Sequence, residues 1–129
     1  MSEKIEGKYL SVTSFKRDGT GVATPVWFVA ENGRLLVETD ADSYKARRIR
    51  RNATVKVAPC NASGRLRGQP VTAVAEFLPE SERERVERLL ARKYRLNRLL
   101  VLPVYRAVQR LLGRRLTRGK PVIVAITPR

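Results

Sequence analysis

Histidine is absent from this 129-residue sequence, and cysteine occurs once, as Cys60. Without histidine the chain cannot build a Ser-His-Asp triad, a Cys-His pair or the usual zinc site. A lone cysteine likewise excludes a disulfide framework and a cysteine-rich metal centre, and Cys60 is expected to be a small buried residue rather than a nucleophile. If the chain is an enzyme, we therefore expect a cofactor to bring the chemistry, because no side chain stands out as a catalytic acid or base.

Acidic residues are also scarce, since 12 Asp and Glu stand against 27 Lys and Arg and the formal net charge is +15. Segment 88–129 holds twelve basic residues and no acidic one, and segment 45–51 holds five basic residues. Charge of this density attracts an anionic partner: a nucleic acid, a membrane surface, or a phosphorylated or polycarboxylate ligand. The alternative is an ordinary solvated surface.

Long apolar runs are missing. The longest covers residues 99–104 and is interrupted by Pro103, whereas about 20 apolar residues are needed to span a bilayer. The first seven residues are polar and include Glu3, Lys4 and Glu6, which is unlike a signal peptide. We therefore expect a cytoplasmic protein.

Several short segments of the sequence alternate polar residues with β-branched and aromatic ones, which is typical of strands. Asp18-Gly19 and Asn32-Gly33 mark hairpin turns between them. These patterns predict a single α+β domain over residues 1–129, mainly β, in which six antiparallel strands close into a small barrel with flanking helices. We expect the first three strands to form a meander. The predicted strands cover about 8–15, 22–30, 34–39, 53–59, 70–78 and 121–127, and the predicted helices cover about 43–51, 80–93 and 96–112.

Pro25 lies inside the second predicted strand. A proline cannot donate to the ladder of hydrogen bonds, so it belongs at an edge, a strand start or a bulge. We expect the sheet to open or kink here, which would let a planar ligand meet the backbone. An ordinary edge-strand proline is the alternative.

The segment from Thr39 to Arg51 is the strongest candidate for a ligand site. It combines a strand end, a helix that Ser43 can cap, and the cations Lys45 and Arg48. A helix N-terminus offers unpaired N–H groups and partial positive charge, which suit an anion such as a phosphate ester. The alternative is a surface helix in which Ser43 is only a cap and the cations are solvated.

Four stretches of this sequence resemble the pyridoxamine 5′-phosphate oxidase-like flavin and deazaflavin oxidoreductases, and most closely their small members that depend on coenzyme F420. The stretches are YLSVTSFKRDGTGVATPVWF (9–28), RLLVETD (34–40), DSYKARRIRRN (42–52) and TVKVAPCNASGR (54–65). The resemblance implies a six-stranded antiparallel split β-barrel and a homodimer with two cofactor sites at the subunit interface. It also implies hydride or electron transfer.

The resemblance also implies roles for individual residues. Thr39, Ser43 and Lys45 fall where the family holds the cofactor phosphate, and Arg48 is a fourth contact. The remaining implied cofactor-binding residues border the ring of the cofactor, on the second strand and on the strand beside it: Thr24, Pro25, Val26, Trp27, Val37 and Glu38.

Two departures from the family favour F420 over FMN. Tyr44 stands where the FMN-using oxidases usually have an arginine, and their C-terminal substrate motif with its Arg and His is missing. The polyanionic tail of F420 also explains more of the cation excess than one phosphate does. The expected activity is an F420-dependent reductase that transfers a hydride to an unsaturated or quinone-like small molecule, and the alternative is an FMN-binding oxidoreductase of the same fold.

Other interpretations remain at this stage. The charge suits a nucleic-acid-binding protein, although aromatic residues make up only 6% of the chain and are not interleaved with the basic runs. Segment 98–115 mixes leucines with arginines and suits a peripheral membrane contact or a buried interface. Trp27 is either a core residue or a wall on which a ring stacks.

Overall fold

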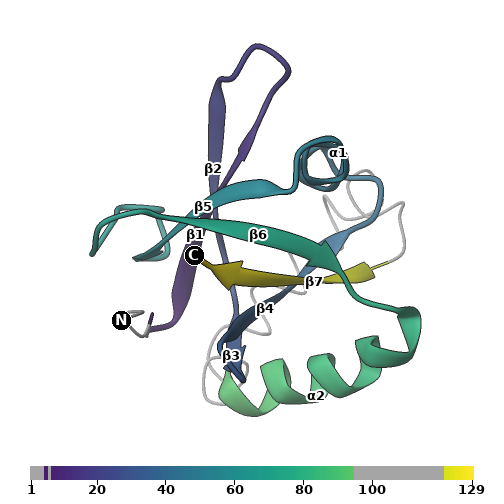
Figure 1. The fold of residues 1–129 in the computed structure, drawn as a ribbon. Coiled ribbons are helices and arrows are strands. Elements are labelled where there is room, and N and C mark those ends of the chain that lie inside the picture. The colour runs from purple at the N-terminus through teal and green to yellow at the C-terminus, as the bar shows by residue number, and fades with distance from the viewer. Residues whose placement is uncertain (1–4, 6, 95–120) are drawn as a thin grey trace, which may run out of the picture.

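The computed structural model describes residue 5, residues 7–94 and residues 121–129. Seven strands form one antiparallel sheet in the order β2-β1-β5-β6-β7-β4-β3, and the sheet curls strongly (Figure 1). The strands are β1 (Tyr9–Phe15), β2 (Gly21–Val26), β3 (Val29–Glu31), β4 (Arg34–Asp40), β5 (Thr54–Cys60), β6 (Val71–Phe77) and β7 (Pro121–Pro128). The helices are α1 (Tyr44–Arg51), the 3₁₀ turn η1 (Glu80–Glu82) and α2 (Arg83–Lys93).

The predicted fold class is confirmed, because the chain is mainly β and its curled sheet is that of a split barrel. The strand count is seven rather than six, since the strand expected over 22–30 breaks at Trp27 and Phe28 into β2 and β3. The break follows Pro25, which has no N–H to give to a ladder. Pro25 itself stands opposite Ser11 within β2, which is an edge strand, so the alternative of an edge-strand proline holds and the sheet opens only after Val26.

The predicted meander is present only in part: both of its hairpins form, but they do not share one continuous strand. β2 pairs only with β1, at one edge of the sheet, whereas β3 pairs with β4 at the other edge. The chain therefore crosses from edge to edge at Trp27 and Phe28, and this crossing brings the two edges of the curled sheet together. Alternating residues show that a segment is a strand, but they do not show where it leaves one partner strand for another.

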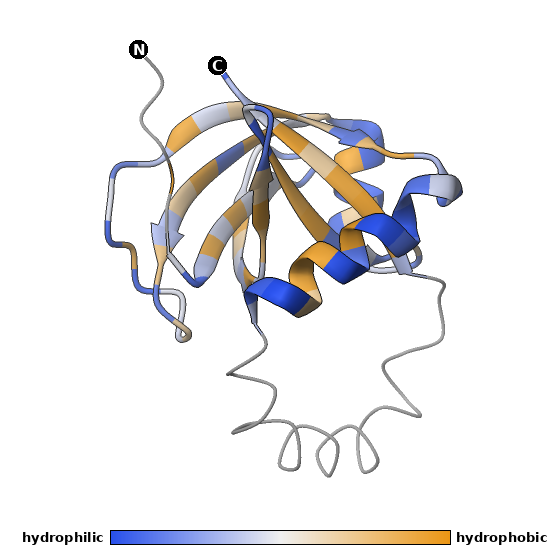
Figure 2. Cartoon of the chain, turned by 90° about the horizontal axis from the view of Figure 1, so that it is seen from below, coloured by the Kyte–Doolittle hydropathy of each residue, from blue (hydrophilic) through white to orange (hydrophobic). Residues whose placement is uncertain are grey.

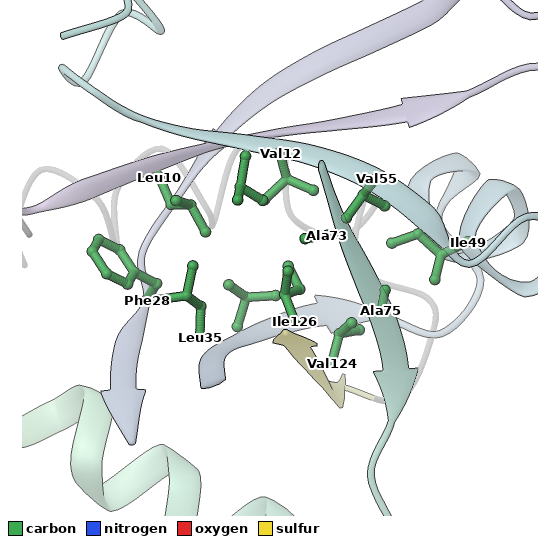
Figure 3. Close-up of a cluster of buried hydrophobic side chains, with 12 residues drawn as sticks. Leu10, Val12, Phe28, Leu35, Ile49, Val55, Ala73, Ala75, Val124 and Ile126 are labelled. Atoms are coloured by element: carbon green, nitrogen blue, oxygen red, sulfur yellow. The ribbon is translucent and has the colours of Figure 1, made fainter. Parts of the chain in front are cut away.

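One face of the curled sheet encloses the main core, because successive side chains of a strand point to opposite faces. Figure 3 shows these side chains converging from several strands, with Ile49 of α1 reaching the same cluster near Val55. α1 therefore closes one end of the barrel. The buried members of this core are Leu10, Val12, Phe28, Leu35, Val37, Ile49, Val55, Val57, Ala73, Ala75, Val124 and Ile126.

The other face of the sheet is covered in part by α2, which lies across the strands (Figure 2). Val86, Leu90 and Tyr94 pack on Leu36 and Ile123 in this second layer. The helix expected over 80–93 is thus present as η1 followed by α2. The helix expected over 96–112 lies outside the described residues. No helix among the described residues is long and apolar enough to cross a membrane.

Candidate functional site

The turn between β4 and α1 builds a helix N-terminus beside a strand end. Ser43 is the N-cap, and its Oγ accepts a hydrogen bond from the backbone N–H of Ala46 at 3.1 Å. Thr39, the penultimate residue of β4, places its Oγ1 3.4 Å from Ser43 Oγ. Two hydroxyl groups therefore meet at the positive end of α1, as an anion site requires.

α1 is fixed on the barrel by its apolar side. Ala46 and Ile49 are buried, and Ile49 belongs to the main core. Arg50 Nη1 donates to the carbonyl oxygen of Ala41 at 2.8 Å, and Arg51 Nη2 donates to that of Phe15 at 2.8 Å. The helix N-terminus is thus held in one place relative to β1 and β4.

Arg48 projects from α1 onto the interior face of β1. Its Nε donates to the Oγ of Ser14 at 2.6 Å, and Ser14 is fully buried. Ser14 shares this face with Leu10 and Val12, where an apolar residue would be expected. Within the described part of the chain, both Nη groups of Arg48 have no hydrogen-bond partner and remain able to donate.

Lys45 lies one turn before Arg48 and is half-buried. Burial lowers the pKa of the Lys45 ammonium, and the positive charge of Arg48 lowers it further. Neither cation forms an ion pair with an acid among the described residues. The nearby carboxylate of Asp40 accepts the N–H of Asp42 at 2.8 Å. Two half-buried, mutually repelling cations are stabilised when an anion binds between them.

The charges of the described residues are unevenly paired. The ion pairs formed between two described residues involve three arginines of α2: Arg83, Arg85 and Arg88. Their partners are acids of η1 and α2, together with Glu31 of β3. The five basic residues of α1 form none among the described residues, so α1 carries positive charge that no described acid neutralises.

The residues expected at the cofactor ring fall on different faces of β2. Thr24 and Val26 lie opposite Val12 and Leu10 on the interior face, and Val26 packs on the core. Pro25 lies between them on the outer face and is exposed. Thr24 Oγ1 is buried and has no hydrogen-bond partner among the described residues. Of the β2 residues expected at the ring, only Pro25 therefore presents its side chain outward.

Trp27 stacks on Tyr94, with ring centroids 4.4 Å apart and planes inclined by 5°. The ring also packs against the layer under α2, and Trp27 is half-buried. One face of the indole is thus taken by Tyr94. The structure supports the packing interpretation of Trp27, and its use as a wall for a cofactor ring stays a prediction.

Val37 and Glu38 of β4 point to opposite faces of the sheet. Val37 is 2% exposed and belongs to the main core, so only its backbone can meet a ligand. Glu38 is exposed on the outer face, opposite Ile123 of β7. The structure therefore brings Thr39 and Ser43 together and seats Lys45 and Arg48 on the same helix, whereas the side chains expected at the ring are spread over two faces.

Sequence reasoning missed two residues at this site. Ser14 offered a signal, since it is a polar residue in phase with Leu10 and Val12 on an apolar face. Tyr94 offered none, because its partners Phe28 and Lys8 are 66 and 86 residues away.

Cys60 is buried, and burial raises the pKa of its thiol, so it lacks the thiolate character of a nucleophile.

Comparisons with known proteins agree with this geometry. The family model described as pyridoxamine 5′-phosphate oxidase matches residues 4–122. No curated protein matches the chain by sequence. The conserved hypothetical protein Rv2991 from Mycobacterium tuberculosis is 23% identical with a TM-score of 0.65, over 95% of this chain and 74% of its own.

Two further solved structures share the fold. An F420 reductase is 16% identical with a TM-score of 0.62, over 95% of this chain and 86% of its own. A pyridoxamine 5′-phosphate oxidase-related, FMN-binding protein from Nostoc punctiforme is 13% identical with a TM-score of 0.52, over 94% and 70% of the two chains. Together with the family match over residues 4–122, the curled sheet places the chain in the pyridoxamine 5′-phosphate oxidase-like family of split β-barrels, a family that includes oxidoreductases.

Proposed function

We propose that this chain is a coenzyme F420-dependent oxidoreductase that acts in the cytoplasm as a homodimer. In this proposal it reduces an unsaturated or quinone-like small molecule. The observation that carries the proposal is the pair of half-buried cations, Lys45 and Arg48, which has no acid partner among the described residues and lies beside the capped N-terminus of α1. A bound anion would neutralise these two cations, and the phosphate of a flavin-type cofactor is such an anion.

The donor set fits a phosphate group. Ser43 and Thr39 supply hydroxyls, Lys45 supplies a point charge, and Arg48 has two Nη groups that can donate in parallel to phosphate oxygens. When bound, the reduced deazaflavin supplies the hydride, and the protein contributes binding, orientation and exclusion of water. The backbone of β2 and the outward ring of Pro25 are then the part of this chain that borders the cofactor ring.

The distribution of charge favours F420 over FMN in this proposal. Beyond Lys45 and Arg48, Arg47 of α1 and the exposed Arg65 and Arg67 are also available to an anionic ligand. The loop that carries Arg65 and Arg67 approaches β2, since a Cβ at Gly64 would lie 3.8 Å from Pro25 Cδ. In this proposal these further cations attract the anionic tail of F420, in addition to the pair that holds its phosphate.

The homodimer in the proposal is supported by the outer face of β2, which is exposed at Pro25. Pro25 is exposed on the outer face, and Tyr94 occupies one face of Trp27. A planar ring laid against β2 is covered by this chain on one side only. A second copy of the chain is therefore proposed to cover the other side and to exclude water there.

The test is a titration of the purified protein with F420 and, separately, with FMN, followed by the fluorescence of Trp27, the only tryptophan. We expect tight F420 binding that weakens as salt is raised, and weaker FMN binding. Failure to bind either cofactor overturns the proposal. Gel filtration with light scattering on the same sample tests the dimer, and a monomer at micromolar concentration overturns that part.

An FMN-binding oxidoreductase is the second candidate. It is supported by the FMN-binding relative from Nostoc punctiforme and by an anion site that one phosphate would fill. Tighter binding of FMN than of F420, with little dependence on salt, selects this candidate.

A further inference from the structure

We propose that Ser14 is a positioning residue of the anion site, whose buried hydroxyl holds the Arg48 guanidinium at Nε and leaves both Nη groups for the anion. The inference rests on the proposed function, because it takes the anion at the N-terminus of α1 as given. It adds a residue of β1 to a site otherwise made from β4 and α1.

The first argument is burial. Ser14 is fully buried on a face otherwise made of Leu10, Val12 and their core neighbours, and a buried hydroxyl is unfavourable there unless it is hydrogen-bonded. Arg48 Nε is its side-chain partner, at 2.6 Å. The hydroxyl and the guanidinium therefore fix each other, and the direction of the Arg48 side chain is set by a rigid strand.

The second argument compares the arginines of α1. Arg50 and Arg51 each use an Nη group to bond a backbone carbonyl, which ties the helix to Ala41 and Phe15. Arg48 alone among these three bonds through Nε to a buried side chain, and its two Nη groups have no partner among the described residues. Because Ala46 and Ile49 already seat the helix, Arg48 is not needed as a further anchor.

The third argument is the preorganisation of charge. Lys45 lies close enough to Arg48 to be repelled by it, so the two cations would separate if Arg48 were free to swing into solvent. The bond to Ser14 keeps Arg48 beside Lys45 and against the barrel. A cation that is already in place loses less side-chain entropy when the anion binds.

The experiment measures the affinity for inorganic phosphate and for FMN by calorimetry in Ser14→Ala, with urea unfolding as the check on folding. We expect both affinities to fall about five- to tenfold, because one oriented charge-assisted hydrogen bond to the anion is lost. Ser11→Ala is the matched control, since Ser11 is also buried in β1 but on the opposite face, and its side chain bonds no other described residue. Ser14→Cys keeps a γ atom but forms only weak hydrogen bonds, and it is used if Ser14→Ala does not fold.

A double-mutant cycle with Arg48→Met separates positioning from plain destabilisation. If Ser14 acts through Arg48, Ser14→Ala costs no further affinity in the Arg48→Met background. An equal loss in both backgrounds, or a loss in Ser11→Ala as large as in Ser14→Ala, overturns the inference. If Lys45→Met also leaves phosphate binding unchanged, the anion site itself fails. If Lys45→Met weakens binding and Ser14→Ala does not, only the inference fails.

Discussion

The hydroxyl of Tyr94 bonds both backbone groups of Phe28, accepting from its N–H at 3.0 Å and lying 2.9 Å from its carbonyl oxygen. Phe28 stands in the gap between β2 and β3, where it has no partner in either ladder. The carbonyl oxygen of Lys8 lies 2.6 Å from the same hydroxyl and is the alternative acceptor for its proton. Lys93 Nζ also donates to the carbonyl oxygen of Phe28 at 2.8 Å. Two neighbouring side chains at the end of α2 thus replace the hydrogen bonds that the sheet loses where it opens.

Tyr94→Phe removes this hydroxyl and keeps the ring that stacks on Trp27. Phe28 is buried, so its N–H is left without a partner, and we expect a loss of about 1–3 kcal/mol in the free energy of unfolding. Urea unfolding followed by Trp27 fluorescence measures the change. Tyr9→Phe is the control, because the Tyr9 hydroxyl bonds no other described residue. A loss in Tyr9→Phe as large as in Tyr94→Phe contradicts the assignment.

Alkaline pH tests the same contact. Burial raises the pKa of Tyr94 from 10.0 to about 12. A group whose pKa is raised in the folded state adds stability below its unfolded pKa and loses it as the pH rises through the folded pKa. We therefore expect Tyr94 to contribute fully below pH 10 and to lose on the order of 2 kcal/mol by pH 12.

The difference in the free energy of unfolding between wild type and Tyr94→Phe isolates this effect, because the other tyrosines and the lysines titrate in both proteins. Urea unfolding at several values between pH 9 and pH 12 gives the two curves. Parallel curves across this range would show that Tyr94 is not the group responsible.

Lys45→Met separates ligand affinity from stability at the anion site. Burial lowers the pKa of Lys45, which means that its charged form is unfavourable in the ligand-free fold. We expect Lys45→Met to raise the urea midpoint of the free protein and to weaken phosphate binding about tenfold or more. Lys56→Met, on the exposed outer face of β5, is the matched control. A variant that loses stability and keeps its phosphate affinity would contradict the site.

Ser43→Asp separates helix capping from ligand binding. An aspartate caps a helix about as well as a serine, so the stability of the free protein should be retained. Its carboxylate then occupies the positive end of α1 and repels a phosphate, so we expect phosphate affinity to fall at least about tenfold. Ser43→Ala should instead cost about 1 kcal/mol of stability with a smaller loss of affinity. Calorimetry and urea unfolding on the three proteins decide between the two roles.

Local sequence determined most elements and the anion-binding end of α1. Asn32 and Gly33 both have positive φ, at 52° and 78°, in the tight turn that their sequence predicts. Ser43 caps α1 as its position before the helix indicates. These features depend on neighbouring residues, whose propensities and hydrogen bonds act within a few positions of the chain.

The tertiary structure alone decided how the two hairpins join into one sheet and which distant side chains serve the site. The 22–30 segment alternates like one strand, yet closure of the curled sheet requires it to leave one edge and join the other. Arg48 meets Ser14 across 34 residues, and Tyr94 meets Phe28 across 66. Such contacts form only because the packed core brings the segments together, and no local pattern records which partner the packing will supply.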